Sequence, residues 1–199
     1  MSDEGKIDPL LIRFMIELFD AISEGMVSRV VYLGAFIDEI LGLAEKLRSD
    51  GVLGDLEKTN FKRTCDFLRE MWSVRYAFFI RIAFSICILL IGASVLLFLG
   101  LTTISDCAFL LLLTLPIAIT FLWIQCNGYS KRLLQEYEDV VSPPVFVKQT
   151  AKEVVQDLIG LCKNMGLPKA IGILRLFNGE YEGIRIIKKV NDEILCEIS

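Results

Sequence analysis

The chain has 199 residues, a net charge of −4 and a hydrophobic fraction of 54%. Its length allows one or two domains, and its apolar content exceeds that of ordinary soluble domains. The absence of histidine removes Ser-His and Cys-His nucleophile pairs and histidine zinc sites, and the sequence contains neither a P-loop nor a G-x-G-x-x-G motif. The acidic balance and the lack of zinc-finger spacing argue against nucleic-acid binding. We therefore expect no catalytic residue, no metal, no cofactor and no nucleic-acid partner.

The six cysteines form no C-x-x-C pair, so we expect small buried hydrophobic side chains in a reducing compartment. A disulfide framework would require a smaller, secreted chain. The N-terminal stretch "MSDEGKIDP" is acidic and polar, unlike the basic start and apolar core of a signal peptide. The first membrane segment is therefore expected to act as an uncleaved anchor.

Residues 9–24 predict an amphipathic helix whose charges fall on one stripe and whose remaining surface is apolar. Because the stripe holds three acids and one base, we expect the apolar face to pack on protein rather than on a membrane surface. A second helix is predicted over residues 27–48, ended by two glycines. A third is predicted from about residue 56 to 100, running from water into the membrane. The charged stripe of the helix predicted over residues 9–24 consists of Arg13, Glu17, Asp20 and Glu24.

Two apolar stretches predict a transmembrane hairpin. Residues 82–101 contain no charge and, at 1.5 Å per residue, span about 30 Å, the thickness of a bilayer core. Residues 107–125 form the second span, and the short connection, residues 102–106, makes the two helices antiparallel neighbours. Between Arg81 and Lys131 the only charged residue is Asp106.

Basic and aromatic residues predict the orientation of this hairpin. The connecting loop contains no lysine or arginine, whereas basic residues flank the other ends of both spans. The positive-inside rule then predicts that both termini are cytoplasmic. Aromatic residues on the same side predict anchoring at one membrane interface. The predicted interface anchors are Trp72, Tyr76, Arg81, Trp123, Tyr129, Lys131 and Arg132.

Small and special residues within the spans leave two alternatives open. They allow close helix packing, either of this hairpin on itself or between copies, and the proline predicts a kink. Asp106 has two interpretations as well: a cap on the second helix, or a ring of carboxylates at the mouth of an oligomeric pore. The predicted packing and kink residues are Ser85, Gly92, Ser94, Thr114, Pro116 and Ala118.

After the hairpin, the second membrane helix is predicted to continue to about Val140, where Ser142-Pro143-Pro144 ends it. The pattern Thr150-x-x-Glu153 predicts a capping box that starts a helix ending near residue 165. Residues 183–198 are β-branched and have Asn-Asp at their centre, which predicts a β-hairpin. Residues 170–177 are interpreted as a helical turn or a third strand.

The predicted fold is mainly α and integral to a membrane, with a two-helix hairpin, helices that extend into a helical cytosolic domain, and a small C-terminal β-hairpin. The first functional hypothesis is a non-enzymatic scaffold or subunit that contacts the lipid bilayer and forms a homo-oligomer or binds a protein partner. The alternative is an oligomeric pore, and a third hypothesis is an enzyme using carboxylates at the membrane face. The predicted domains are cytosolic residues 1–80, the hairpin at 81–126, and cytosolic residues 127–199.

Overall fold

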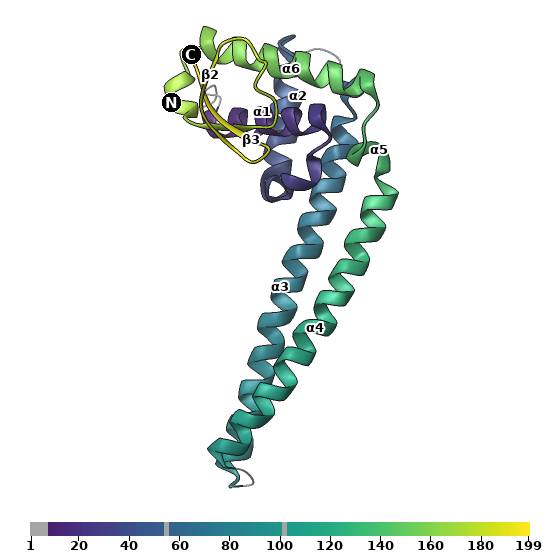
Figure 1. The fold of residues 1–199 in the computed structure, drawn as a ribbon, viewed down its shortest axis with the longest axis vertical. Helices are drawn as coiled ribbons and strands as arrows, with labels where there is room; N and C mark the ends of the chain where they lie inside the picture. Colours follow the sequence, from purple (N-terminus) through teal and green to yellow (C-terminus); the bar gives the residue numbers. More distant parts are fainter. Residues whose placement is uncertain (1–7, 54–55, 101–102) are drawn as a thin grey trace. The chain divides into compact units, whose positions relative to one another are not determined.

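The computed structural model describes residues 8–53, 56–100 and 103–199. This part of the chain is mostly helical and carries one small antiparallel sheet, which confirms the predicted fold class at that level (Figure 1). It divides into two compact units. We call Met1–Glu70 with Tyr137–Ser199 the globular unit, and Met71–Glu136 the hairpin unit.

The helix α1, Pro9–Glu24, has the predicted bounds because both of its ends carry strong local signals. The carboxylate of Asp8 accepts a hydrogen bond from the backbone N–H of Leu10 at 2.9 Å, and proline occupies the first turn. The helix ends at Gly25, which adopts a φ of +72° that an L-residue rarely takes. Most side chains along α1 are buried, so this helix is the centre of the globular unit.

The segment predicted as one helix over residues 27–48 is irregular in its first half. Short 3₁₀ turns, η1 Val27–Arg29 and η2 Val31–Phe36, precede the α-helix α2, Ile37–Ser49. Valines that are stiff at χ1 and a glycine weaken α-helix formation in this stretch. The tighter 3₁₀ geometry is common in such short pieces.

The long helix α3, Phe61–Phe98, begins after the 3₁₀ turn η3, Leu56–Thr59. Asn60 separates the two with a φ of +53°, so the continuous helix predicted from about residue 56 is wrong in its first turn. In the globular unit, Phe61 of α3 stacks on Phe19 of α1 with 5.0 Å between ring centroids. The first ten residues of α3 thereby complete the core around α1.

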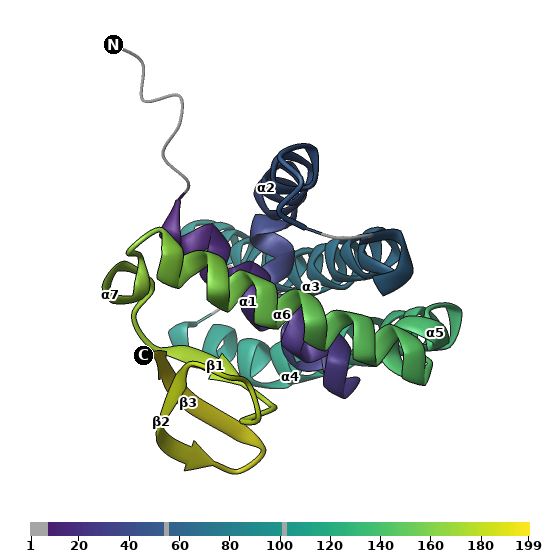
Figure 2. The ribbon, with the colours of Figure 1, turned by 90° about the horizontal axis from the view of Figure 1, so that it is seen from above.

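The helix α6, Val145–Asn164, lies along α1 in the globular unit (Figure 2). It follows the short α5, Glu138–Val141, and begins directly after Pro144, so the predicted start at Thr150 is wrong. Two consecutive prolines cannot continue the preceding helix, but the fixed φ of Pro144 suits the start of the next one. The hydroxyl of Thr150 instead bonds to the carbonyl of Phe146 at 2.9 Å, inside the helix.

The C-terminal residues build the sheet. After the turn α7, Pro168–Ile171, come β1, Leu174–Leu176, β2, Ile184–Val190, and β3, Glu193–Ile198. The described strands pair antiparallel in the order β1-β3-β2, which confirms the hairpin predicted over residues 183–198 (Figure 2). Residues 170–177 contain both predicted elements, a helical turn and then a strand. Asn191 makes the tight turn with a φ of +55°.

Candidate membrane hairpin and a buried acidic clamp

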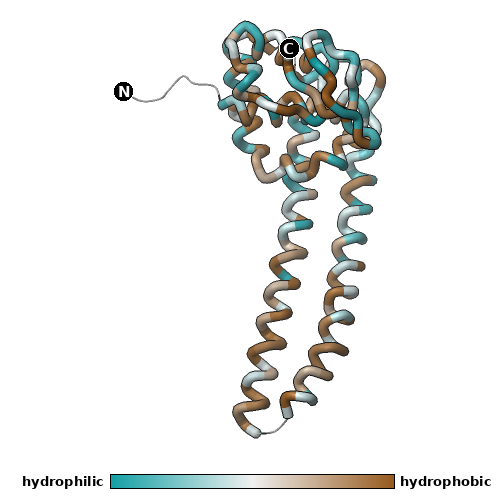
Figure 3. Tube along the Cα trace, turned by 60° about the vertical axis from the view of Figure 1, so that its left-hand side comes forward, coloured by the Kyte–Doolittle hydropathy of each residue, from teal (hydrophilic) through white to brown (hydrophobic). Residues whose placement is uncertain are grey.

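The hairpin unit contains α3 from Met71 onward and the whole of α4, Ile104–Glu136. These two helices run side by side (Figures 1 and 3). By length and composition, both helices are apolar enough to cross a membrane. The chain itself buries 0% of the most apolar window of α3 and 6% of that of α4. These windows are therefore not the core of the described protein. Their apolar side chains face outward and require another cover.

Asp106 caps the first turn of α4. Its carboxylate accepts hydrogen bonds from the hydroxyl of Thr103 at 2.6 Å and from the Thr103 backbone N–H at 3.0 Å. The Thr103 hydroxyl in turn accepts from the backbone N–H of Asp106 at 3.3 Å. This reciprocal arrangement is a capping box. It accounts for the single charge in the apolar stretch, and the pore-mouth ring stays a prediction.

The helix α4 begins inside the connection predicted over residues 102–106. Residues 104–106 form its first turn, and residue 102 lies outside the described residues, as does residue 101 at the end of the first predicted span. The hairpin unit also extends beyond the predicted hairpin, residues 81–126, because it includes the polar ends of both helices. The membrane boundaries themselves stay predictions.

The hydroxyls among the predicted packing residues bond within their own helices. Ser85, Ser94 and Thr114 each donate to the backbone carbonyl four residues earlier at 2.8 Å. This pattern satisfies the hydroxyl without linking the two helices. Contact between the helices is instead close at Cys107, whose thiol lies 3.7 Å from the carbonyl oxygen of Ala93.

The other predicted packing residues occupy different surroundings. A Cβ placed on Gly92 would have no described atom within 4 Å, so Gly92 does not mark a close helix crossing within this hairpin. Pro116 is exposed inside α4, and the helix continues through it. Ala118 is half-buried.

The predicted interface anchors gather at one end of the hairpin unit. A pocket of about 170 Å³ is lined by side chains of α3 between Ser73 and Arg81 and of α4 between Leu122 and Tyr129, so these two stretches face each other. Trp72 is half-buried, whereas the other predicted anchors are exposed. Those exposed anchors are Tyr76, Arg81, Trp123, Tyr129, Lys131 and Arg132.

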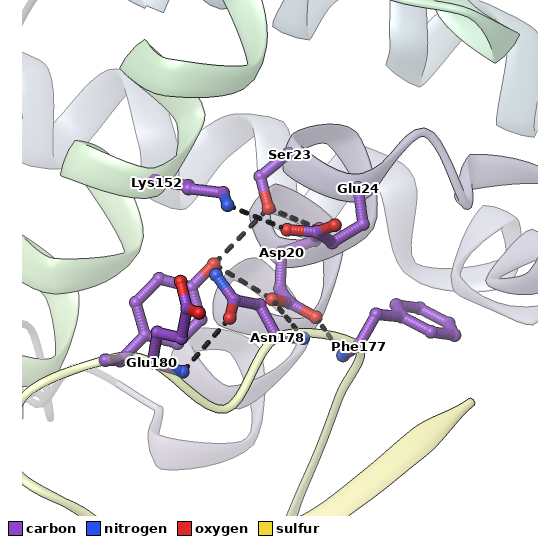
Figure 4. Close-up of polar contacts among 8 residues, drawn as sticks. Asp20, Ser23, Glu24, Lys152, Phe177, Asn178 and Glu180 are labelled. Carbon is purple, nitrogen blue, oxygen red and sulfur yellow. Dashed lines mark hydrogen bonds and ion pairs between the residues drawn. The ribbon is translucent and has the colours of Figure 1, made fainter. Parts of the chain in front are cut away.

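The middle of the charged stripe of α1, Glu17 and Asp20, is buried in the globular unit, contrary to the ordinary amphipathic pattern, whereas Arg13 and Glu24 at its ends are half-buried. Asp20 is 0% exposed, and its carboxylate accepts hydrogen bonds from the backbone N–H groups of Phe177 and Asn178, the latter at 3.3 Å (Figure 4). The hydroxyl of Tyr181 donates to the same carboxylate at 2.9 Å and lies 3.3 Å from the hydroxyl of Ser23. One side chain of α1 thus holds the loop that follows β1.

Glu17 occupies an equivalent place one turn earlier and is 1% exposed. Its carboxylate accepts from Arg13 at 3.0 Å, from the Tyr32 hydroxyl at 2.8 Å and from the backbone N–H of Arg175 at 3.2 Å. Alternate residues of a strand direct their N–H groups to the same side, and β3 pairs with the other side of β1. Glu17 and Asp20, which we call the acidic clamp, therefore close the free edge of the sheet at β1.

Burial raises the pKa of Asp20 from its usual value of 3.8 to about 6. The hydrogen bonds from Phe177, Tyr181 and Asn178 lower this pKa but only partly offset the loss of hydration. Burial and the neighbouring carboxylate raise the pKa of the Tyr181 hydroxyl as well. Within the described residues, every fully buried side-chain nitrogen and oxygen has a hydrogen-bond partner. The clamp is a saturated network closed to solvent, which suits a structural role.

All six cysteines lie in the described residues and are free. Burial raises the pKa of the Cys65 thiol to about 12 and that of the Cys196 thiol to about 11, so both are unreactive near neutral pH. The prediction of buried cysteines is confirmed for these two, for Cys107 and for Cys162, whereas Cys126 is half-buried and Cys87 is exposed on the hairpin. The described residues bring together no group of three or more cysteine, aspartate or glutamate side chains placed to hold a metal ion.

Sequence reasoning identified the acids of α1 but not their burial. The width of the apolar face of α1 was a usable signal for this burial, because it leaves little of the helix surface to be exposed to solvent. No protein-family model, curated protein or solved structure matches this chain.

Proposed function

We propose that the protein is a non-enzymatic, two-pass integral membrane protein that assembles through its helices as a scaffold or subunit of a membrane complex. The observation that carries the proposal is the exposed apolar surface of α3 and α4, whose most apolar windows are 0% and 6% buried by the chain. A bilayer covers such surface along a helix about 30 Å long. Both backbones are helical there, which satisfies their polar groups within the membrane.

In this proposal the globular unit and both termini are cytoplasmic. The distribution of lysine and arginine supports this orientation, because the loop between the spans lacks both residues. The aromatic side chains at the same end of the hairpin unit support it too. A domain built from segments before and after the hairpin then lies on one side of the membrane.

A scaffold role is favoured over catalysis and over conduction. Asp20, Ser23 and Tyr181 are of residue types that catalysts use, but they are buried and occupied by one another and by the backbone. An ion pathway needs polar groups free to replace water within the membrane. The described hydroxyls of the spans donate to their own helices instead.

Membrane extraction and particle mass test this proposal together. Alkaline carbonate is expected to leave the full-length protein in the membrane pellet. After mild detergent solubilisation, we expect a particle heavier than one 22.5 kDa chain with its detergent, because copies or a partner subunit remain bound. A monodisperse single chain without a partner would refute assembly, and release by carbonate would refute membrane integration.

Gly92→Leu provides a sharper test of assembly through the spans. Because a Cβ at Gly92 meets no described atom within 4 Å, the single hairpin accommodates a larger side chain, whereas a second helix packed there does not. We expect this variant to lower the particle mass. Ala108→Leu adds similar apolar volume at an exposed position of the other helix, α4, and is the matched control.

Planar-bilayer recording separates the pore hypothesis from the scaffold. The purified protein is expected to give no conductance at any voltage. A cation-selective conductance that Asp106→Asn reduces would replace the scaffold proposal with a pore whose mouth carries a carboxylate ring.

A further inference from the structure

A polar pocket of about 410 Å³ lies between α3 and α4 in the hairpin unit. Arg81 contributes to it from α3, and four residues contribute from α4. Residues spaced by three and four lie on one face of a helix, so the α4 set forms a single stripe facing Arg81. The α4 residues are Gln125, Gly128, Tyr129 and Arg132.

The pocket is rich in hydrogen-bond donors and lacks acids. Arg81 and Arg132 line it together with Gln125 and Tyr129, whose side chains all carry hydrogen-bond donors, and no acidic residue lines it. Among the described residues neither arginine forms an ion pair within 4.0 Å. Gly128 leaves the helix backbone open there, since a Cβ would meet no described atom within 4 Å. Two positively charged residues lining one pocket suit an anion with several oxygens, such as a phosphate.

The position of the pocket along the helices favours a lipid over a free phosphate. Arg81 directly precedes the first apolar span, and Gln125 ends the second. Within one turn of Gln125 toward the loop, Phe121 is 60% exposed and Ile124 is 59% exposed. A free phosphate would use the donors but leave this apolar surface uncovered. A phospholipid covers both, with its phosphate at the arginines and its acyl chains along α4.

Resting on the proposed function, we propose that this pocket binds the phosphate of an anionic phospholipid in the leaflet at the end of the hairpin unit that carries Arg81 and Arg132. The two arginines hold the phosphate oxygens, Gln125 and Tyr129 donate to the phosphate or glycerol oxygens, and Gly128 allows the headgroup to approach the backbone. The site makes the hairpin unit selective for headgroup charge, whereas the exposed apolar surface alone accepts any lipid.

Lipid binding to the full-length protein in detergent micelles tests the proposal. Bound phosphatidylglycerol and phosphatidylcholine with identical acyl chains are counted by native mass spectrometry. We expect the wild type to prefer phosphatidylglycerol. Arg81→Gln and Arg132→Gln should each weaken that binding about fivefold, and the pair of substitutions about thirtyfold, because each basic residue near a membrane surface contributes an attraction of that size.

Matched variants separate this site from general surface charge. Arg75→Gln with Lys131→Gln removes two exposed bases of the hairpin unit that do not line the pocket, and it should leave the preference unchanged. Arg81→Lys with Arg132→Lys keeps the charge and should retain most of the preference, which guards against a variant that merely loses its fold. Glycerol 3-phosphate should not displace the lipid.

Three results would overturn the site: equal binding of both lipids by the wild type, equal weakening by the Arg75 and Lys131 control, or displacement by glycerol 3-phosphate. Loss of the preference in the lysine pair would overturn its electrostatic basis. Carbonate extraction of the membranes from which the protein is purified, done before detergent is added, distinguishes the two proposals. Protein that stays in the membrane without a lipid preference refutes the pocket alone, whereas protein released by carbonate refutes the membrane function on which it rests.

Discussion

The stability of the globular unit should fall as pH rises from about 4 to about 6, because of Asp20. The buried carboxyl releases its proton at a pKa of about 6, against 3.8 when exposed. Between these values the folded protein binds a proton that the unfolded chain does not, so protonation stabilises the fold. This contribution is complete below the unfolded pKa and is lost as pH rises through the folded pKa. At 1.36 kcal/mol per pKa unit, the shift corresponds to about 3 kcal/mol.

Asp20→Asn isolates this effect because the carboxamide has the shape of the protonated acid and no charge. We expect the variant to lose the pH dependence and, apart from the cost of any acceptor that the carboxamide fails to replace, to match the wild type near pH 4. At pH 7 it should be more stable by up to about 3 kcal/mol, reduced by the 1–3 kcal/mol that an unpaired buried donor costs if Phe177 or Asn178 loses its acceptor. Asp20→Ala, by contrast, removes every acceptor and should destabilise the unit by about 2–5 kcal/mol at all pH values.

Amide hydrogen exchange of residues 174–181 in the full-length, micelle-bound protein measures these changes. Exchange rates are normalised to those of the unstructured peptide at the same pH. Because 1.4 kcal/mol is a factor of ten, the wild-type protection should fall roughly a hundredfold between pH 4 and pH 7. Constant wild-type protection would refute the raised pKa. A slope that survives in Asp20→Asn would show that a group other than Asp20 causes it.

The remaining predictions concern the same unit. Tyr32→Phe removes the hydroxyl that donates to Glu17 at 2.8 Å and should destabilise the unit by about 1.5–3 kcal/mol in urea titrations, whereas Tyr76→Phe on the hairpin should change nothing. Gly25→Ala places a Cβ at a φ of +72° and should lower stability by about 1–2 kcal/mol; an unchanged thermal midpoint would contradict this strain. Cys196, buried and with a thiol pKa raised to about 11, should resist maleimide at pH 7 until urea unfolds the unit, and peptide mapping that finds label on Cys196 of the native protein, rather than on the exposed Cys87 alone, would disprove that protection.

Elements with local signals at both ends were predictable from the sequence. Asp8 and Gly25 delimit α1, and the turn at Asn191 sets the register of β2 and β3. The start of α6 was misplaced because Thr150 matches a capping pattern, although the proline pair before Val145 had already started the helix. The capping pattern at Thr150 and the proline pair both indicate a helix start. The proline pair determines the actual start, because its ring fixes φ.

The partners of the acidic clamp could not be predicted because they are distant from it in sequence. Asp20 contacts the backbone of Phe177, 157 residues later, and the pattern of α1 alone is that of a solvated stripe. A carboxylate is buried only where several donors meet it, and here those donors belong to a strand edge and the loop after it. The proposed lipid pocket was partly predictable, because the sequence alone places Gln125, Gly128 and Arg132 on one face of a helix. That Arg81 lies opposite them follows only from the pairing of α3 with α4.

A domain interrupted by a helical hairpin requires that its two chain segments meet where the hairpin begins and ends. In the globular unit, Arg63 of α3 pairs with Asp139 of α5 at 2.9 Å, and the Tyr137 hydroxyl donates to Glu70 at 3.0 Å. Phe67 packs against the Tyr137 ring with 5.5 Å between centroids. These contacts hold together the two ends of the loop that the hairpin forms. They offset the conformational entropy that is lost when those ends are brought together. The clamp at Glu17 and Asp20 then joins the N-terminal helix to the C-terminal sheet, and the unit folds as one body although the hairpin divides its sequence.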